Sequence, residues 1–177
     1  MSQVTTPMAH IPQRPVLGLR RQPGRLALLL FRMPLQAYHH GKGWMLGHTF
    51  VLFTHIGRRT GQRRETVAMV LRYRPEHKEV VVCSAWGPDT DWVRNLRERP
   101  AVRVETGRDV YEPEQRFLSA DESRVVIDEC VLAHPWRFQF LGWVLGWGDL
   151  KDEKIASEVV VTRPFVVFSS VNGPRIP

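Results

Sequence analysis

Two apolar segments, separated by a short basic turn, dominate the hydrophobic pattern in the first half of the chain. Residues 44–56 and 64–74 are rich in Val, Leu, Phe, Thr and Met, a composition that favours β-strands. The turn between them has the sequence GRRTGQRRE, from Gly57 to Glu65, and Gly57 and Gly61 permit a tight hairpin. We therefore predict an antiparallel pair of strands with arginines at its tip.

The rest of the pattern predicts short strands and a few helices. We expect a strand at 79–85, a second hairpin formed by 101–107 and 110–118, and a last strand at 158–170 that Pro164 interrupts or places at an edge. Helices are expected at 24–33, at 91–99 with a cap from Asp89 or Asp91, and at 119–134. Strands and helices do not alternate regularly, so the pattern favours an α+β fold. Its core would be an antiparallel barrel with helices at the rim and one N-terminal helix.

The length of 177 residues suits a single domain with a sizeable core. We predict a flexible basic arm at 1–23, rich in Pro and Arg, and one domain at 24–177. The apolar run at 26–31 is too short to span a membrane, and no cleavage site follows it. The two cysteines show neither metal-site spacing nor a disulfide framework, and the histidines form no metal-binding pair, so we expect a cytoplasmic protein without a metal.

Positive charge is concentrated in the first third of the chain. The formal net charge is +7, yet residues 1–64 hold ten Lys or Arg and no Asp or Glu. Such a field attracts phosphates, polyanions or anionic lipid surfaces. Residues 14–40 are therefore a candidate for peripheral membrane contact on the cytoplasmic face, with packing of the 24–33 helix on the body as the simpler interpretation.

The basic turn has two interpretations from its residues alone. It is either a solvated cationic hairpin tip or an anion site, in which backbone N–H groups and arginine side chains hold a phosphate or carboxylate. Side chains of a strand alternate between faces, so Arg64 and Arg63 point to opposite sides. We expect Arg59 and Arg64 to face a ligand. We expect Arg63 to pair with Glu65 or meet solvent, and Arg58 to meet solvent.

A second group of candidate residues begins at the end of the predicted strand 79–85. The run SAWG, Ser84 to Gly87, combines small residues that leave room for a flat ring with one tryptophan. In the helix that follows, Trp92 and Asn95 lie on one face at i and i+3. Trp92 is either a core residue or the wall of a planar-ligand site, with Asn95 as a polar anchor.

Taken in order, the runs THIGRRTGQRRET, VVVCSAWG and DWVRNLRERPAVRVETG resemble the deazaflavin-dependent nitroreductases, also called coenzyme F420-dependent quinone reductases. The resemblance covers roughly residues 40–120. It implies a split β-barrel like the FMN-binding barrels, and a deazaflavin cofactor with a phosphate and an oligoglutamate tail. The positions that match the cofactor-binding residues of that family are Arg59, Thr60, Gly61, Arg64, Val67, Ala68, Met69, Ser84, Ala85, Trp86, Gly87, Trp92 and Asn95.

The chain departs from the family pattern in two places. Some members have Lys at the position of Trp86, and some carry tyrosines near the C-terminus that line the substrate side. Here an aromatic stripe with helical spacing occupies that region, which is either core or dimer packing or a wall of the substrate site: Trp136, Phe140, Trp143 and Trp147. The sequence therefore does not identify the residue that delivers a proton.

The resemblance implies an enzyme that transfers a hydride between reduced coenzyme F420 and a planar electron-poor acceptor, such as a quinone, a nitroaromatic or an activated alkene. One alternative is the same barrel binding FMN, or carrying the deazaflavin without catalysis. Another is a basic nucleic-acid-binding module, which the separation of basic from aromatic residues disfavours. We expect a small-molecule acceptor, no nucleic acid, and a possible homodimer.

Overall fold

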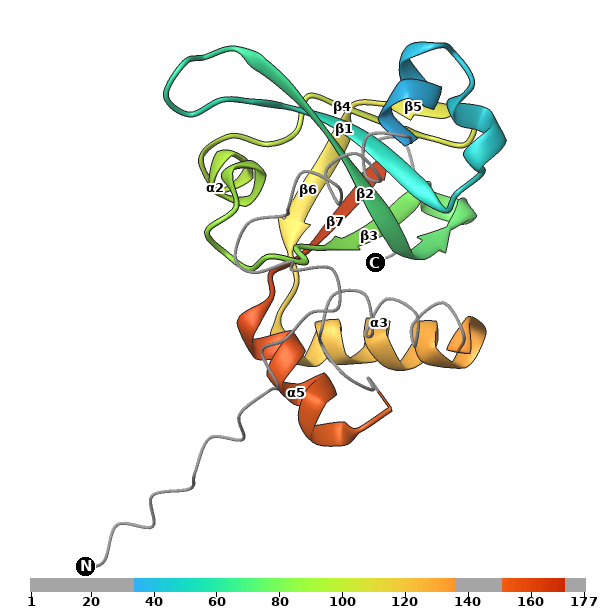
Figure 1. Cartoon of the computed structure of the whole chain (residues 1–177), viewed down its shortest axis with the longest axis vertical. Coiled ribbons are helices and arrows are strands. Elements are labelled where there is room, and N and C mark those ends of the chain that lie inside the picture. The colour runs from blue at the N-terminus through green and yellow to red at the C-terminus, as the bar shows by residue number, and fades with distance from the viewer. Residues whose placement is uncertain (1–33, 136–150, 171–177) are drawn as a thin grey trace, which may run out of the picture.

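The computed structural model describes residues 34–135 and 151–170, and within them an antiparallel sheet of seven strands is accompanied by helices (Figure 1). The order of the strands in the sheet is β5-β4-β1-β2-β3-β7-β6. The strands are β1 Phe50–Ile56, β2 Arg63–Arg74, β3 Glu79–Cys83, β4 Arg103–Thr106, β5 Asp109–Tyr111, β6 Pro113–Phe117 and β7 Phe165–Ser170. The helices are α2 Asp91–Glu98, α3 Ala120–Ala133 and α5 Glu153–Thr162, with the short 3-10 helices η1 Gly43–Leu46 and η2 Pro75–His77, and residues 34–39 are also helical.

The chain connection between the two outermost strands shows that the sheet curls into a nearly closed barrel. β5 and β6 lie at opposite ends of the strand order, yet only Glu112 separates Tyr111 from Pro113. Two residues of extended chain span at most about 7 Å. The two edges of the sheet therefore meet at this point without forming a ladder, which confirms the predicted antiparallel split barrel of an α+β fold.

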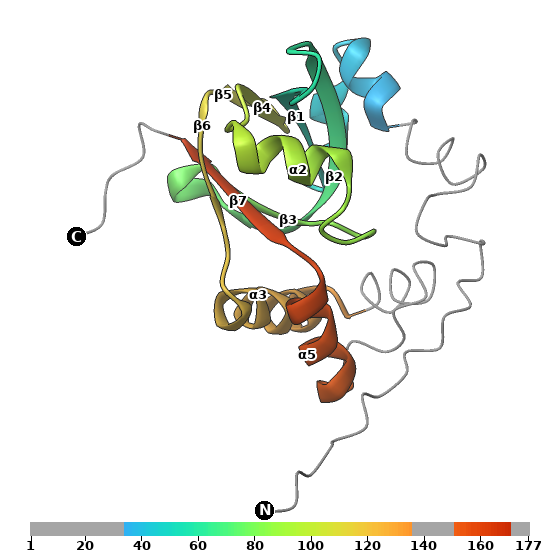
Figure 2. The ribbon, with the colours of Figure 1, turned by 90° about the vertical axis from the view of Figure 1, so that its left-hand side faces the viewer.

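Alternation along the strands separates two apolar clusters. Val80 and Val82 face the barrel interior with Val51, Phe53 and other apolar side chains. Val81, between them, faces outward against α3 and α5, which cover that side of the sheet (Figure 2). Helix α2 lies beside the barrel and contributes Leu96 to the interior cluster.

The predicted strands at 44–56, 64–74 and 79–85 are confirmed in their central parts. β1 pairs with β2 in the antiparallel register Thr54↔Glu65 and His55↔Arg64, as the hairpin prediction requires. β1 begins only at Phe50, because Gly43–Leu46 forms the 3-10 helix η1 and Gly47, with φ +53, turns the chain. β3 ends at Cys83 rather than at Ala85.

Two predictions for the C-terminal half are wrong in part. The segment at 110–118 is not one strand, since β5 completes the hairpin with β4 and β6 crosses to pair with β7. The segment at 158–170 is a strand only after Pro164. Its first half belongs to helix α5, because Asp152 caps the helix and the core takes up Ala156 and Val159, which outweighs the β-propensity of its valines.

The structure agrees with the predicted ends of helices α2 and α3 but not with the predicted N-cap of α2. α3 begins with a capping box in which the Ser119 hydroxyl accepts from the Glu122 N–H and the Glu122 carboxylate accepts from the Ser119 N–H. α2 ends before Pro100, but its N-cap is Thr90 rather than Asp89 or Asp91. Those two aspartates instead form ion pairs with Arg94 and Arg58.

Several predictions fall outside the described residues. These are the arm at 1–23, the helix at 24–33 and the aromatic residues Trp136, Phe140, Trp143 and Trp147. The helical residues 34–39 were not predicted, since the predicted helix at 24–33 ends before them. Within the described parts of the chain, no helix has both the length and the apolar character needed to cross a bilayer.

The cap of α5 gives a test of the helix that replaces the predicted strand. The Asp152 carboxylate accepts from the N–H groups of Lys154 and Ile155. We expect Asp152→Ala to lower the free energy of unfolding by about 1 kcal/mol, because helix N–H groups lose their partner. Chemical denaturation measures the effect, with Asp128→Ala, which removes only an exposed i,i+4 ion pair, as the matched control. Equal effects of the two variants would argue against the cap.

Candidate functional site

The β1–β2 turn is held in one tight shape by its own backbone. The Gly57 N–H donates to the Gln62 carbonyl at 2.8 Å, and the Gly61 N–H donates to the Gly57 carbonyl at 2.8 Å. Gly61 has φ +66, a conformation that favours glycine. A Cβ on Gly57 would lie 2.9 Å from the Thr60 hydroxyl oxygen. The turn therefore favours glycine at position 61 and leaves little room for a side chain at position 57, and it carries Arg58, Arg59 and Thr60.

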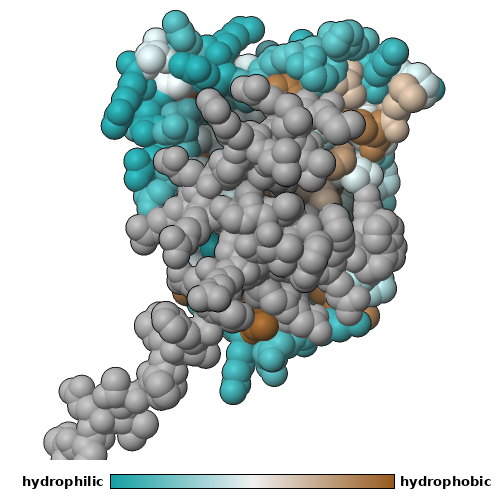
Figure 3. All heavy atoms as spheres, viewed as in Figure 1, coloured by the Kyte–Doolittle hydropathy of each residue, from teal (hydrophilic) through white to brown (hydrophobic). Residues whose placement is uncertain are grey.

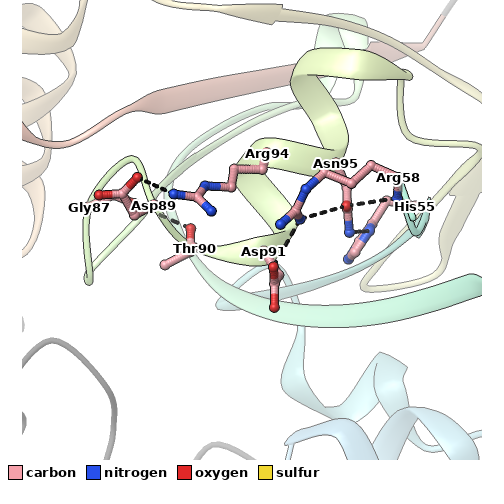
Figure 4. Close-up of polar contacts among 8 residues, drawn as sticks. All are labelled: His55, Arg58, Gly87, Asp89, Thr90, Asp91, Arg94 and Asn95. Atoms are coloured by element: carbon pink, nitrogen blue, oxygen red, sulfur yellow. Dashed lines mark hydrogen bonds and ion pairs between the residues drawn. The ribbon is translucent and has the colours of Figure 1, made fainter. Parts of the chain in front are cut away.

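Arg58 anchors this turn to helix α2 (Figure 4). Its backbone N–H and its guanidinium both donate to the Asn95 side-chain oxygen, at 3.0 and 3.2 Å, and the guanidinium donates to Asp91 at 2.9 Å. The Arg58 side chain is only 15% exposed. The prediction that the Arg58 side chain meets solvent is therefore wrong, because its guanidinium group binds Asp91 and Asn95 and so holds the turn against α2.

The same network orients a buried histidine. Arg58 offers only donors, so the oxygen of Asn95 faces it and the Asn95 nitrogen donates to His55 Nδ1 at 3.1 Å. The proton of a neutral His55 is then on Nε2, which lies 3.1 Å from the Thr66 hydroxyl. Burial, with Arg64 nearby, lowers the pKa of His55 to about 4. His55 is thus a neutral, structural imidazole at pH 7.

Three arginines around the turn are exposed and have no carboxylate partner within the described residues: Arg59, Arg63 and Arg64. The expected pair of Arg63 with Glu65 is not formed. Glu65 instead contacts His39 of the helical segment 34–39, with 2.7 Å between the His39 nitrogen and the carboxylate oxygen. The turn therefore presents three exposed cations that form no ion pair among the described residues, which is an arrangement suited to a polyanion.

A polar groove of about 560 Å³ lies beside these arginines. It is lined by Thr54, Arg63, Arg64, Glu65, Arg103 and Glu105. Its two carboxylates are already engaged, Glu65 with His39 and Glu105 with Arg103 at 2.8 Å. Both Arg63 and Arg64 line this groove, although strand alternation places their backbone positions on opposite faces. The expectation that only one of them faces a ligand stays a prediction.

The strand-end residues Ser84 to Gly87 form a closed turn of their own. The Ser84 hydroxyl, buried, donates to the Gly87 carbonyl at 2.7 Å and lies 3.1 Å from the Thr90 hydroxyl. Gly87 has φ +90, and a Cβ there would lie 3.0 Å from the Arg163 guanidinium. Ala85 packs against the outer cluster, and Trp86 is half-buried. Ser84 is thus committed to shaping the turn that leads into α2.

The other predicted residues divide between the barrel interior and its outer face. Trp92 packs against Phe53 in an edge-to-face contact with 5.3 Å between the ring centroids, which favours its interpretation as a core residue. Ala68 also packs against the interior cluster. Val67 and Met69 point the other way, toward the face that carries the groove, because they alternate with Ala68 along β2.

The structure therefore gathers part of the predicted set around the arginine turn. The turn and the start of β2 hold Arg59, Thr60, Gly61 and Arg64. Asn95 of helix α2 binds the same turn through Arg58. Sequence reasoning missed the other polar groove residues, Thr54, Arg63, Glu65, Arg103 and Glu105. One signal was present, since Thr54 is a polar side chain in an apolar strand, and β1 pairs it with Glu65 and Arg103 on either side.

The pKa of His55 gives a test of the buried network. Because the folded state lowers this pKa from 6.5 to about 4, the unfolded chain binds the proton more readily between these values. Stability from this group is complete above pH 6.5 and is lost as the pH falls toward 4. We expect the advantage of the wild type over His55→Gln to shrink by on the order of 2 kcal/mol between pH 7 and pH 4.

Urea denaturation at a series of pH values measures this difference, with the exposed His40→Gln as the control. A difference between wild type and His55→Gln that does not change with pH would show that His55 is not held neutral by the fold.

Comparisons with known proteins agree with these features. The family model described as "F420H(2)-dependent quinone reductase" matches residues 31–137. No curated protein gave a match. Among solved structures, one described as an F420-H2 dependent reductase is 20% identical over 70% of this chain and 96% of its own, with a TM-score of 0.48.

Two further solved structures are more distant. One described as a domain-swapped dimer is 18% identical over 77% of this chain and 99% of its own, with a TM-score of 0.47. A pyridoxamine 5'-phosphate oxidase-related FMN-binding protein from Nostoc punctiforme is 9% identical over 85% of this chain and 83% of its own, with a TM-score of 0.42. The family model spans well over half of the chain and includes the arginine turn, the groove strands and helix α2. The chain therefore belongs to the F420H(2)-dependent quinone reductase family and is an F420-dependent oxidoreductase.

Proposed function

We propose that this protein transfers a hydride between reduced coenzyme F420 and a planar electron-poor acceptor, and that the arginine turn holds the anionic part of the cofactor. The observation that carries the proposal is the group of three exposed arginines, Arg59, Arg63 and Arg64, without carboxylate partners among the described residues. They surround a rigid glycine turn and border a groove of about 560 Å³.

The chemistry of the groove fits the group that the family uses. F420 carries a phosphate and an oligoglutamate tail, and both are anions that guanidinium groups bind through charge-assisted hydrogen bonds. The groove carboxylates would repel such a ligand if they were unpaired. Glu105 is ion-paired with Arg103 and Glu65 is hydrogen-bonded to His39, and the three lining arginines outnumber these two carboxylates, so the net charge of the groove is positive.

Each part of the chain has a separate role in this proposal. Arg59, Arg63 and Arg64 bind the anionic tail, while Arg58 and Asn95 position the turn that carries them. Val67 and Met69 offer apolar surface on the same face for the flat part of the cofactor. When bound, the deazaflavin supplies the hydride chemistry, and the protein supplies binding, orientation and exclusion of water.

The alternatives differ in what they require of the arginines. FMN has a single phosphate and no oligoglutamate, so it would use fewer of them. A deazaflavin carrier would use the same arginines without turnover. Peripheral membrane contact through 14–40, a homodimer and the cytoplasmic location remain predictions, as does the domain boundary at residue 24.

We expect Arg59→Ala, Arg63→Ala and Arg64→Ala each to weaken F420 binding by about tenfold or more, because each removes a charge-assisted contact. Fluorescence titration of F420 measures the dissociation constant. Arg124→Ala, which removes an equal charge from α3 at a position that lines neither cavity, is the matched control and should change it by less than about twofold. Wild-type affinity in all three turn variants would rule out the proposed cofactor site, and tight FMN binding without F420 binding would favour the alternative cofactor.

We expect the wild type, supplied with reduced F420, to reduce quinones and nitroaromatics and to leave saturated ketones unchanged, because hydride transfer needs an electron-poor planar acceptor. The rise in the absorbance of oxidised F420 with time measures turnover across the panel. Binding of F420 without turnover of any acceptor would favour the carrier alternative.

A further inference from the structure

A second cavity, of about 460 Å³, lies next to the arginine groove and has a different character. Its walls include Tyr38, Trp44, Glu105, Arg108 and Val110, and glycines complete the lining. Glu105 also lines the arginine groove, so the two cavities are neighbours on the outer face of the sheet. The volume falls within the range of roughly 300–1,000 Å³ that small-molecule sites occupy.

The frame of this cavity is fixed by contacts between the N-terminal segment and the β4–β5 hairpin. The Tyr38 hydroxyl donates to the Phe50 carbonyl at 2.8 Å, and burial raises the pKa of Tyr38, so the donor stays protonated. The Gly107 N–H donates to the Gly47 carbonyl at 2.9 Å. The Thr106 hydroxyl donates to the Phe50 carbonyl at 3.2 Å. These bonds join the two walls of the cavity.

Two glycines let the walls approach closely. A Cβ on Gly43 would collide with the Tyr38 ring, and a Cβ on Gly107, where φ is +56, would lie 2.7 Å from the His48 ring. Backbone therefore packs directly against aromatic rings on both sides. Glycine is therefore favoured where these two backbone segments pass the Tyr38 and His48 rings.

The apolar side chains of this region are exposed although they are large. Trp44 is 52% exposed, Met45 65% and Val110 52%. In Figure 3 brown and tan residues gather over the part of the surface where η1 and β5 lie in Figure 1. The Arg108 guanidinium lies over the Trp44 ring at 5.6 Å from its centroid, although both side chains are exposed. The lining of the cavity thus includes an aromatic ring and a hydrogen-bond donor close to each other.

We infer that this cavity binds the hydride acceptor as a flat, electron-poor ring that stacks on Trp44 while Arg108 donates to one of its carbonyl or nitro oxygens. The inference rests on the proposed function, because it assigns the acceptor to the cavity beside the proposed cofactor groove. An electron-rich indole stacks favourably on an electron-poor ring. Glu105 is paired with Arg103 and so does not repel the oxygens of the acceptor.

Direct binding of menadione, a two-ring quinone without a lipid tail, tests this assignment. Equilibrium dialysis on the full-length protein, with and without oxidised F420, gives its dissociation constant. We expect Trp44→Ala to raise that constant about tenfold and Arg108→Gln to raise it several-fold, with Trp44→Phe close to the wild type. Leu132→Ala, which removes an 83% exposed apolar side chain from α3, is the matched control. Thermal melting verifies that each variant is folded, which we expect because the substituted side chains are at least half exposed or lie at the surface.

The outcomes separate this inference from the proposed function. Weaker menadione binding in Trp44→Ala and Arg108→Gln, with unchanged F420 affinity, supports the acceptor cavity. Unchanged menadione binding in both variants, or equal weakening in Leu132→Ala, overturns it even if the enzyme turns over. Loss of menadione binding in Trp44→Ala together with a wild type that never oxidises reduced F420 supports the cavity and overturns only the hydride-transfer proposal.

Discussion

The side-chain amide of Asn95 is the contact on which the candidate site depends. Its oxygen accepts from the backbone and the guanidinium of Arg58, and its nitrogen donates to His55. One buried amide therefore joins helix α2, the arginine turn and strand β1. This arrangement draws Arg58 inward and leaves Arg59, Arg63 and Arg64 at the surface. The distinction between the structural arginine and the three ligand-binding candidates thus comes from a hydrogen-bond network that is satisfied on all sides.

The closure of the sheet places the two cavities on one face. β4 pairs with β1, and β1 with β2, so Thr54 has Arg103 and Glu65 as direct neighbours. The arginine groove forms at the ends of these strands, and the second cavity forms where the β4–β5 hairpin meets the segment that follows Tyr38. The arginine groove and the second cavity consequently share Glu105 at their boundary. Because the two cavities are neighbours, we assign the cofactor tail to one and the acceptor to the other.

Local sequence signals predicted the elements whose local preferences and tertiary roles agree. The hairpin at Gly57–Gly61 was predictable because the turn needs a residue with positive φ, and Ser119 with Glu122 forms the capping box that its spacing suggests. The valines before Pro164 misled the prediction, because Asp152 and the core under α5 favour a helix there. Arg58 was misassigned, because it lies in the turn and its partners Asp91 and Asn95 come from helix α2, which is distant in the sequence.

The sequence by itself determined that an arginine-rich, glycine-containing turn joins two strands, and the order of its motifs pointed to the family that the comparison then established. Only the tertiary structure decided which arginines are exposed, which intramolecular contacts Ser84, Trp92 and Asn95 make, and that Glu105 and Trp44 border neighbouring cavities. The physical reason is that hydrophobic period and turn chemistry are local properties. Pairing of charges and the shape of a groove depend on residues brought together from distant parts of the chain, as Glu65 is with His39 and Thr54 with Arg103.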